Sequence, residues 1–308
     1  MSRRLAGARV RVPCSTSNMG SGYDAIGLAL ERYLEVSFDP NDGGELAVQR
    51  EGTLASLPPN EGHDLVASTF LGELRREGVE PTGVLRLTSS IPVARGLGSS
   101  AAAVLAGFDL ARAALGRPRA DQEAFDLALR HEGHGDNAAP CLYGGLRAVA
   151  RTADGTAVIR LKLAESVGFA YAAPAARLST ESARSVLPKT VPHRVAAASL
   201  GRFAALIRGL AEGRVDLIQI GVKDELHVPY RLPLIPSAAG AMSAAMDAGA
   251  WAVTVSGAGS GLMAMCEPAR AAEIAEAMRL VFDAGVGDPE CVGFAVRPDH
   301  LGLQRLAR

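Results

Sequence analysis

Residues 92–102 place a glycine-containing loop between an apolar stretch and an alanine-rich helical pattern, and this order restricts the fold more than any other feature. Val84, Leu85, Leu87 and Ile91 indicate a strand and its exit before the loop. In such a unit glycines let a ligand approach the backbone, and the first N–H groups and the dipole of the helix attract an anion. We expect a phosphate-binding loop here; a tight turn before an ordinary capped helix is the alternative.

The side chains of this loop indicate which kind of phosphate-binding loop it is. Ser99 and Ser100 stand where hydroxyl groups cap a helix, contact phosphate oxygens or bind Mg²⁺. The loop is not a Walker A motif, because no Gly-Lys-Ser/Thr sequence follows it. The lysines of the chain, Lys162, Lys189 and Lys223, are all far from it in sequence.

Composition excludes several classes of function. A chain of 308 residues is long enough for two domains, and 48% hydrophobic with 21% charged residues is typical of a globular protein. The net charge of −1 and the lack of a basic run argue against nucleic acid as a main partner. No run of 18 apolar residues and no secretory signal is found, so no membrane partner is expected. The four scattered cysteines form neither a metal motif nor a disulfide framework, which favours a cytoplasmic enzyme.

Two further stretches combine glycines with polar side chains. Residues 13–27 read as a loop that follows a short strand at residues 9–12 and brings Asn18 and Asp24 near the edge of the core. The second stretch carries a glutamate, a histidine, an aspartate and an asparagine within residues 132–137. A carboxylate there can hold a cation and the other groups can bind a polar substrate, although a helix end with incidental polar residues is the alternative.

The remaining pattern predicts a mixed α+β chain. Helices are expected from Asp64, from Ser100 to about Leu115 and from Asp121 to about His131. A hairpin is expected around residues 153–155, where we place the boundary between domains 1–155 and 156–308. In the second half a strand, a glycine-rich turn at residues 256–261, a strand, a helix and a strand suggest an antiparallel α+β layer.

Taken in order, these stretches resemble the superfamily of galactokinase, homoserine kinase, mevalonate kinase and phosphomevalonate kinase, and within it the homoserine kinases most. The resemblance extends over nearly the whole chain and rests on residues 12–30, 92–102, 132–145, 179–188, 223–231 and 256–259. It implies an N-terminal ATP-binding domain like ribosomal protein S5 domain 2, followed by a ferredoxin-like C-terminal domain. It also implies a cytoplasmic homodimer that phosphorylates the hydroxyl of L-homoserine in threonine biosynthesis, with ATP and Mg²⁺.

The resemblance assigns roles residue by residue. Ser100 and Glu132 match Mg²⁺ ligands, while Arg184 and Arg231 match positions that bind the substrate carboxylate. The other implied substrate residues are Asn18, Asp24, His134, Asn137 and Thr180. The implied ATP-binding residues are Pro92, Arg95, Gly96, Leu97, Gly98, Ser99, Ser100, Ala101 and Ala102.

The family resemblance does not identify a catalytic base. Asn137 stands where sister kinases carry an aspartate, and an amide accepts no proton at neutral pH. We therefore expect Asn137 and Asp24 to act by orienting the substrate hydroxyl.

Two departures from the family pattern affect nucleotide binding. Ser260-Gly261 replaces a usual Pro-Thr and should loosen its turn, and within residues 62–66 Asp64 replaces a usual Asn.

Two other functions remain open from the sequence. One is phosphorylation of a different small molecule by the same kind of enzyme, such as a mevalonate-pathway or shikimate kinase. The other is a regulator that binds a ligand without catalysis, which predicts damage to the phosphate loop or to the Mg²⁺ positions. Ser100, Glu132 and the loop glycines are intact, which favours catalysis.

Overall fold

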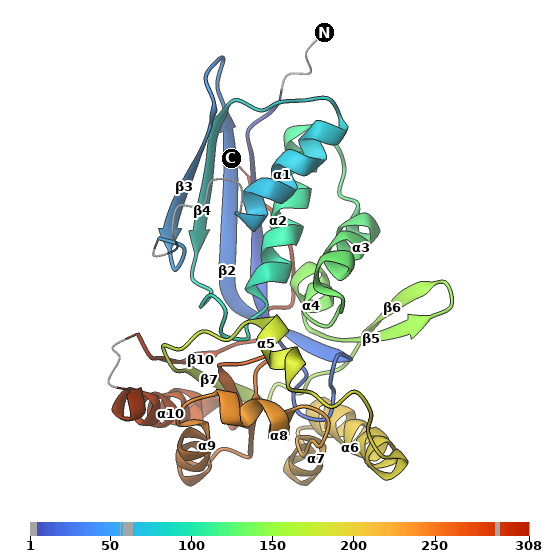
Figure 1. The fold of residues 1–308 in the computed structure, drawn as a ribbon, viewed down its shortest axis with the longest axis vertical. Helices are drawn as coiled ribbons and strands as arrows, with labels where there is room; N and C mark the ends of the chain where they lie inside the picture. Colours follow the sequence, from blue (N-terminus) through green and yellow to red (C-terminus); the bar gives the residue numbers. More distant parts are fainter. Residues whose placement is uncertain (1–4, 56, 58–63, 287–289, 308) are drawn as a thin grey trace.

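Two β-sheets organise the chain in the computed structural model, which describes residues 5–55, 57, 64–286 and 290–307 (Figure 1). The larger sheet has the order β11-β1-β2-β4-β3, with β5 paired to β2 and β6 paired to β5. Its strands are β1 (Ala8–Ser17), β2 (Ile26–Pro40), β3 (Leu46–Gly52), β4 (Gly83–Ser89), β5 (Leu146–Thr152), β6 (Gly155–Arg160) and β11 (Gln304–Arg305). The smaller, antiparallel sheet has the order β10-β7-β9-β8 and consists of β7 (Gly168–Ala173), β8 (Ala252–Val255), β9 (Leu262–Cys266) and β10 (Val292–Val296).

One helix is buried at the centre of the first half. It is α2 (Ser99–Ala114), which packs against β1 and β2 and is flanked by α1 (Leu65–Arg76), α3 (Asp121–Glu132) and α4 (Ala138–Tyr143) (Figure 1). Its small side chains, among them Ala101, Ala102 and Ala106, are buried and let neighbours approach closely. The loop before α2 is therefore attached to a rigid element. The three helices predicted in this region are confirmed: each begins within one residue of its predicted start, and α2 and α3 also end within one residue of their predicted ends.

The expected loop at residues 13–27 is shorter than predicted. Strand β1 continues to Ser17, across a register shift between Pro13 and Cys14, and β2 begins at Ile26. Both faces of this part of β1 are buried, so its polar residues obscured the alternation that normally reveals a strand. Because side chains alternate along a strand, Ser15 and Ser17 share one face.

Strand β7 is buried along its whole length because it lies between two hydrophobic cores. Phe169 and Tyr171 pack into the core that continues into the first half of the chain. Ala170 and Ala172 face the other way, toward α9 (Ala238–Asp247) and α10 (Ala271–Val286). The predicted antiparallel α+β layer is thereby confirmed, and it shares a core with the larger sheet.

The remaining helices lie around the smaller sheet (Figure 1). They are α5 (Thr180–Ser185), α6 (His193–Glu212), α7 (Val215–Gly221), α8 (Val228–Arg231) and the 3₁₀ helices η1 (Leu232–Leu234) and η2 (Pro268–Arg270). None of the helices in the described ranges is long and apolar enough to cross a membrane.

The expected boundary at residue 155 falls inside the β5–β6 hairpin. Both strands of this hairpin belong to the larger sheet, and β11, from the end of the chain, pairs with β1 in the same sheet. We therefore propose that the first domain extends to Arg160 and also includes β11.

Candidate active site

A cavity of about 510 Å³ lies where the phosphate-type loop, the end of β1, the end of α3 and α5 meet. It contains most of the polar residues singled out in the sequence. Those that line it are Asn18, Asp24, Gly96, Leu97, Gly98, Ser99, Ser100, Glu132, His134, Asn137, Thr180, Arg184 and Arg231. Pro92, Arg95, Ala101 and Ala102 are not among its lining residues.

The loop before α2 fits too closely against its neighbours for side chains at two of its glycines. A Cβ at Gly96 would lie 1.9 Å from the Ser256 carbonyl oxygen, and one at Gly98 would lie 2.4 Å from Ser15 Oγ. Both glycines also have positive φ, 74° and 62°. Gly98 is the N-cap of α2, and no side chain among the described residues caps this helix. Its first N–H groups and the hydroxyls of Ser99 and Ser100 are thus left for a ligand in the cavity.

Arg95 points away from the cavity, although its loop forms one wall. Its guanidinium donates to the carbonyl oxygens of Glu290 (2.9 Å) and Ala175 (3.2 Å), and Tyr171 donates to the Arg95 carbonyl. The residue therefore attaches the loop to the smaller sheet, and a side-chain contact with phosphate is no longer expected. Ala101 and Ala102 are fully buried in the core, so they support the loop from behind.

Unpaired buried polar atoms gather at the end of α3. Glu132 Oε1, His134 Nε2 and Asp136 Oδ2 are buried without a hydrogen-bond partner among the described residues. Each of these residues lines the cavity. Because burying a polar atom without a hydrogen bond is costly, these three atoms fit a cation or a polar ligand in the cavity. Glu132 and Ser100, from the adjacent helices α3 and α2, are suited to a hard cation such as Mg²⁺.

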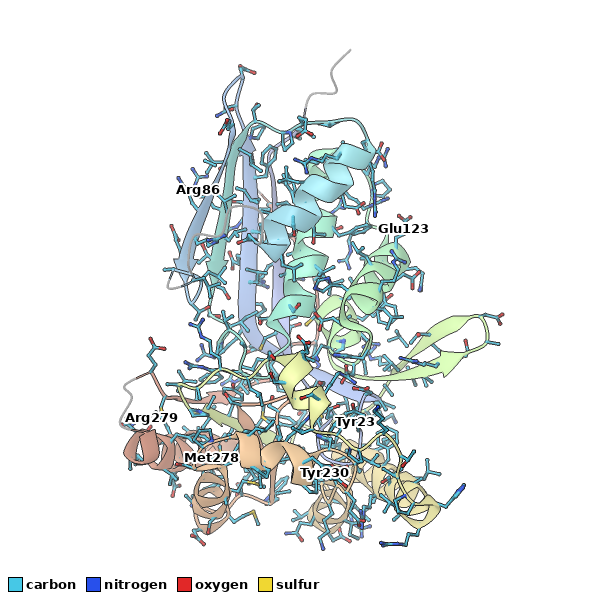
Figure 2. The ribbon with its side chains drawn as sticks, in the orientation of Figure 1. Tyr23, Arg86, Glu123, Tyr230, Met278 and Arg279 are labelled. Atoms are coloured by element: carbon cyan, nitrogen blue, oxygen red, sulfur yellow. The ribbon has the colours of Figure 1, made fainter. Side chains whose placement is uncertain are left out.

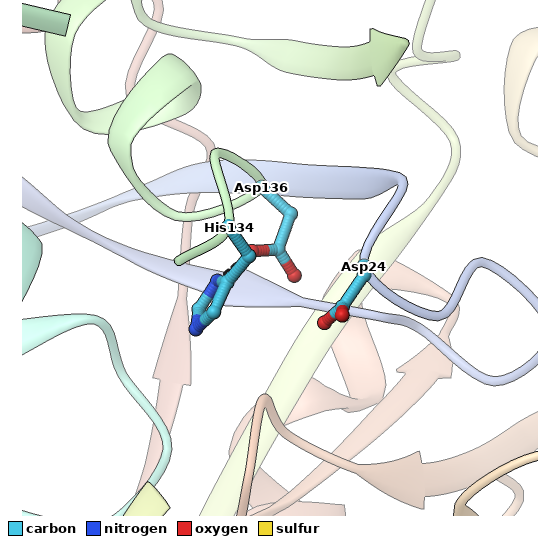
Figure 3. Close-up of side chains that lie close together, drawn as sticks. All are labelled: Asp24, His134 and Asp136. Carbon is cyan, nitrogen blue, oxygen red and sulfur yellow. Dashed lines mark hydrogen bonds and ion pairs between the residues drawn. The ribbon is translucent and has the colours of Figure 1, made fainter. Parts of the chain in front are cut away.

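His134 and Asp136 form a close pair opposite Asp24 (Figure 3). His134 Nδ1 lies 2.5 Å from Asp136 Oδ1, and ligand atoms of all three residues lie within 4.8 Å of one another. Burial lowers the pKa of His134, but the hydrogen bond and negative charge of Asp136 outweigh it, and the pKa is raised above its usual value. Two carboxylates and a histidine thus lie together in this part of the cavity.

Two arginines, Arg184 and Arg231, line the cavity beside these groups, and a third, Arg50, lines it next to Asp64. Arg184 on α5 forms a bidentate ion pair with Asp24, at 2.7 and 3.1 Å. Arg231 at the end of α8 is 1% exposed and donates to the carbonyl oxygens of Ala183 and Gly257. Tyr23 lies against both, with its ring centroid 5.7 Å from Arg184 and 5.4 Å from Arg231, near the junction of the two sheets (Figure 2).

Asn18 and Asn137 are already held by the protein. Asn18 accepts the Asp24 N–H at 2.9 Å and donates to the Gly257 carbonyl at 2.8 Å, so it fixes the turn that carries Asp24. Asn137 accepts from Ser15 Oγ at 2.9 Å and donates to Ser17 Oγ at 3.1 Å. These contacts fix the Asn137 amide beside Gly98 of the phosphate-type loop. Thr180 begins α5 and is exposed at the rim; the N-cap of that helix is Ser179.

The two sequence departures have local structural roles. Asp64 caps α1 by accepting from Val66 N and Ala67 N, and it pairs with Arg50 at 2.8 Å. Gly62 and His63 lie outside the described residues.

The turn at Ser260-Gly261 is not loose, contrary to expectation. Ser260 donates to the Ala176 carbonyl, and a Cβ at Gly261 would lie 2.3 Å from the hydroxyl of Tyr171.

Sequence reasoning assigned no role to four residues that the structure places at or next to the site: Ser15, Ser17, Tyr23 and His227. Asp136 was singled out only as part of the polar cluster at residues 132–137. Asp136 adjoins Asn137, and its unpaired oxygen is visible only in the fold. The period-two spacing of Ser15 and Ser17 is a usable strand signal, but the glycines and small polar residues that follow favour a loop over the whole stretch. For Tyr23 and His227 no local signal was available, because their partners are far away in sequence.

Comparisons with known proteins agree with this geometry. The family models for the GHMP kinase N-terminal and C-terminal domains match residues 64–145 and 199–284. Homoserine kinases of Synechococcus sp. (strain RCC307) and Moorella thermoacetica are 39% and 38% identical, covering 87% and 89% of this chain and 87% and 92% of their own. The crystal structure of homoserine kinase from Cytophaga hutchinsonii superposes with a TM-score of 0.84, at 28% identity over 97% of both chains.

Fold and site thus define a kinase of the GHMP class, and within that class the chain belongs to the homoserine kinase family. The two-domain α+β fold implied by the sequence resemblance is confirmed, with its S5-like first part and ferredoxin-like second part. A crystal structure of Leishmania major mevalonate kinase, 15% identical with a TM-score of 0.70, shares the fold alone.

Proposed function

We propose that this protein transfers the γ-phosphoryl group of ATP to the side-chain hydroxyl of L-homoserine, which gives O-phospho-L-homoserine for threonine biosynthesis. The observation that carries the proposal is a single cavity in which a phosphate-type loop meets buried carboxylates and arginines. A zwitterionic amino acid needs groups of both signs to hold it, whereas mevalonate and shikimate carry no ammonium group. The membership of the chain in the homoserine kinase family supports this substrate.

The donor phosphates are assigned to the loop before α2. The N–H groups from Gly96 to Ser100, together with the helix dipole, provide fixed positive partial charge for them. Ser100 and Glu132 would hold Mg²⁺, whose chemistry is to neutralise charge on the transferring phosphates. The unpaired Glu132 Oε1 supports this assignment. The apolar end of the cavity, with Leu65, Val66 and Val93, is assigned to the adenine base.

The acceptor is assigned to the opposite end. Arg184 and Arg231 would bind the substrate carboxylate, since a guanidinium fork matches that group. Asp24 and the unpaired oxygen of Asp136 would bind the ammonium. The further substrate contacts that the sequence implied, by His134, Thr180 and Asn18, stay part of the proposal. For Asn18 the contacts above also support a second task, which is to position Asp24.

Phosphoryl transfer is assigned to alignment and charge stabilisation, without a dedicated strong base. Asn137 has no group that accepts a proton at neutral pH, and its amide is fixed by Ser15 and Ser17. A loose transition state allows the hydroxyl proton to leave late. Asn137 and Asp24 would then orient the attacking oxygen toward the phosphate.

Asn137→Ala is expected to lower kcat by about tenfold or more, which corresponds to about 1.4 kcal/mol of lost transition-state stabilisation. The measurement is steady-state release of ADP, with Asn41→Ala in an exposed turn as the matched control. A kcat reduced less than tenfold in a variant that melts like the wild type would contradict the orienting role.

The direct test of the proposed function is ADP release by the purified protein with ATP, Mg²⁺ and L-homoserine, compared with mevalonate and shikimate. We expect turnover with L-homoserine and background rates with the other two. Turnover with mevalonate or shikimate alone would assign the protein to another substrate of this kinase class. No turnover with any of the three would favour a ligand-binding regulator.

A homodimer in the cytoplasm is proposed from the family resemblance, and sedimentation of the purified protein tests the dimer.

A further inference from the structure

His227 is completely buried before α8 and contacts Arg231, which is one of the arginines of the cavity. Arg231 Nη1 lies 3.1 Å from His227 Nδ1, and the Gly20 carbonyl oxygen lies 3.0 Å from His227 Nε2. A guanidinium has no acceptor, and a carbonyl oxygen has no proton to donate. The two contacts are therefore compatible with only one state of the ring, a neutral imidazole that carries its proton on Nε2.

The charges around His227 favour the same state. Burial lowers the pKa of the imidazole; Asp224, the Gly20 carbonyl and Asp24 act against this, and Arg231 acts with it. The net pKa is below the usual value for histidine, so the ring is neutral at pH 7. The Asp224 carboxylate accepts the N–H groups of Leu226, His227 and Val228 and lies 3.7 Å from Nε2, beyond hydrogen-bond distance.

Arg231 has little freedom in this arrangement. Its Nε donates to the Ala183 carbonyl, and its Nη1 donates to the Gly257 carbonyl as well as to His227. Nη2 takes part in none of these bonds. The Tyr23 ring stacks on the imidazole, with centroids 5.1 Å apart and an angle of 28° between the rings, and it also lies beside the Arg231 guanidinium.

We propose that His227 is a positioning residue for substrate recognition: its Nδ1 lone pair fixes the orientation of the Arg231 guanidinium, so that Nη2 is left for the carboxylate of the substrate. This inference rests on the proposed function, in which Arg231 binds that carboxylate. A fixed planar donor group loses less entropy on binding than a mobile one. Loss of the Nδ1 acceptor would leave Nη1 short of a partner in a buried site and let the guanidinium turn.

Two substitutions separate this role from simple packing. In His227→Asn the amide oxygen can take the place of Nδ1, whereas in His227→Gln the longer amide reaches the place of Nε2 and the acceptor for Arg231 is lost. We expect His227→Gln to raise the KM for L-homoserine about tenfold and His227→Asn to raise it no more than about threefold. The KM for ATP should not change in either variant. His193→Gln, at the exposed start of α6, is the control.

Equal homoserine KM values in the two variants, or a parallel rise in the KM for ATP, would show that His227 acts through packing alone. The unaltered protein provides a second test, since ¹⁵N chemical shifts of the ring report its tautomer. A neutral ring with a bare Nδ1 is expected; a proton on Nδ1 overturns the proposal, whether or not the variants fold. If the wild type fails to bind L-homoserine in calorimetry, the proposed function is wrong, while the tautomer measurement still decides whether His227 accepts from Arg231.

Discussion

Glu132→Gln is expected to lower kcat by about a hundredfold or more while leaving the protein folded. The Glu132 carboxylate is buried at the end of α3, and its Oε1 has no partner among the described residues. A neutral amide keeps the shape of the side chain but removes the charge that would hold Mg²⁺. We therefore also expect the Mg²⁺ concentration for half-maximal activity to rise. The measurement is a titration of ADP release with Mg²⁺ at saturating ATP and L-homoserine.

Thermal unfolding gives this prediction a second readout. Glu132 Oε2 lies 3.8 Å from His134 Nε2, but Oε1 is buried without a hydrogen bond among the described residues, and a buried carboxylate satisfied on one oxygen only is costly. Glu132→Gln should therefore melt at the same temperature as the wild type or above it. The matched control is Glu123→Gln on the same helix, where the side chain is 68% exposed (Figure 2). A Glu132→Gln enzyme with wild-type kcat and Mg²⁺ dependence would remove Glu132 from the metal site.

Arg184→Met should raise the KM for L-homoserine by about thirtyfold or more, equivalent to about 2 kcal/mol, with little change in the KM for ATP. Two effects add. The substrate carboxylate loses a donor fork, and Asp24, which is 31% exposed and paired with Arg184, becomes an uncompensated negative charge beside it. The KM of Arg184→Lys for L-homoserine should lie between those of the wild type and Arg184→Met, because lysine keeps the charge but not the bidentate geometry.

The control for this experiment is Arg194→Met, an exposed position on α6. It changes the net charge by the same amount without touching the cavity. An unchanged homoserine KM in Arg184→Met, or a KM for ATP that rises to the same extent, would contradict the assignment of Arg184 to the substrate carboxylate.

Most elements of the fold follow from local sequence. The helices at residues 65–76, 99–114 and 121–132 begin near the predicted residues. The first has apolar residues at four-residue spacing, and the second is indicated by its alanine-rich run. Strand β1 was predicted too short because burial on both faces removes the alternation on which strand prediction depends. The hairpin was found, but the sheet to which it belongs is set by pairing with β2, which lies more than a hundred residues earlier.

The candidate site could be predicted from the sequence only in part. The glycine-rich loop and the cluster at residues 132–137 are contiguous, so their chemistry is visible without a structure. The direction of Arg95 was not visible, because it depends on the carbonyls of Ala175 and Glu290. The same holds for Asn18, which fixes Asp24 through contacts that no local pattern reveals.

The sequence by itself determined the class of chemistry: a lysine-free phosphate loop and two carboxylate-bearing loops are recognisable from neighbouring residues, and the family resemblance added the two arginines. Only the tertiary structure decided which of their atoms face the cavity, which are used to hold the protein together, and that His227 contacts Arg231 from behind the site. Backbone turns and helix starts are encoded within a few residues, whereas the partners of a buried charge come from distant segments. Their positions are set by the packing of the two sheets and their shared core.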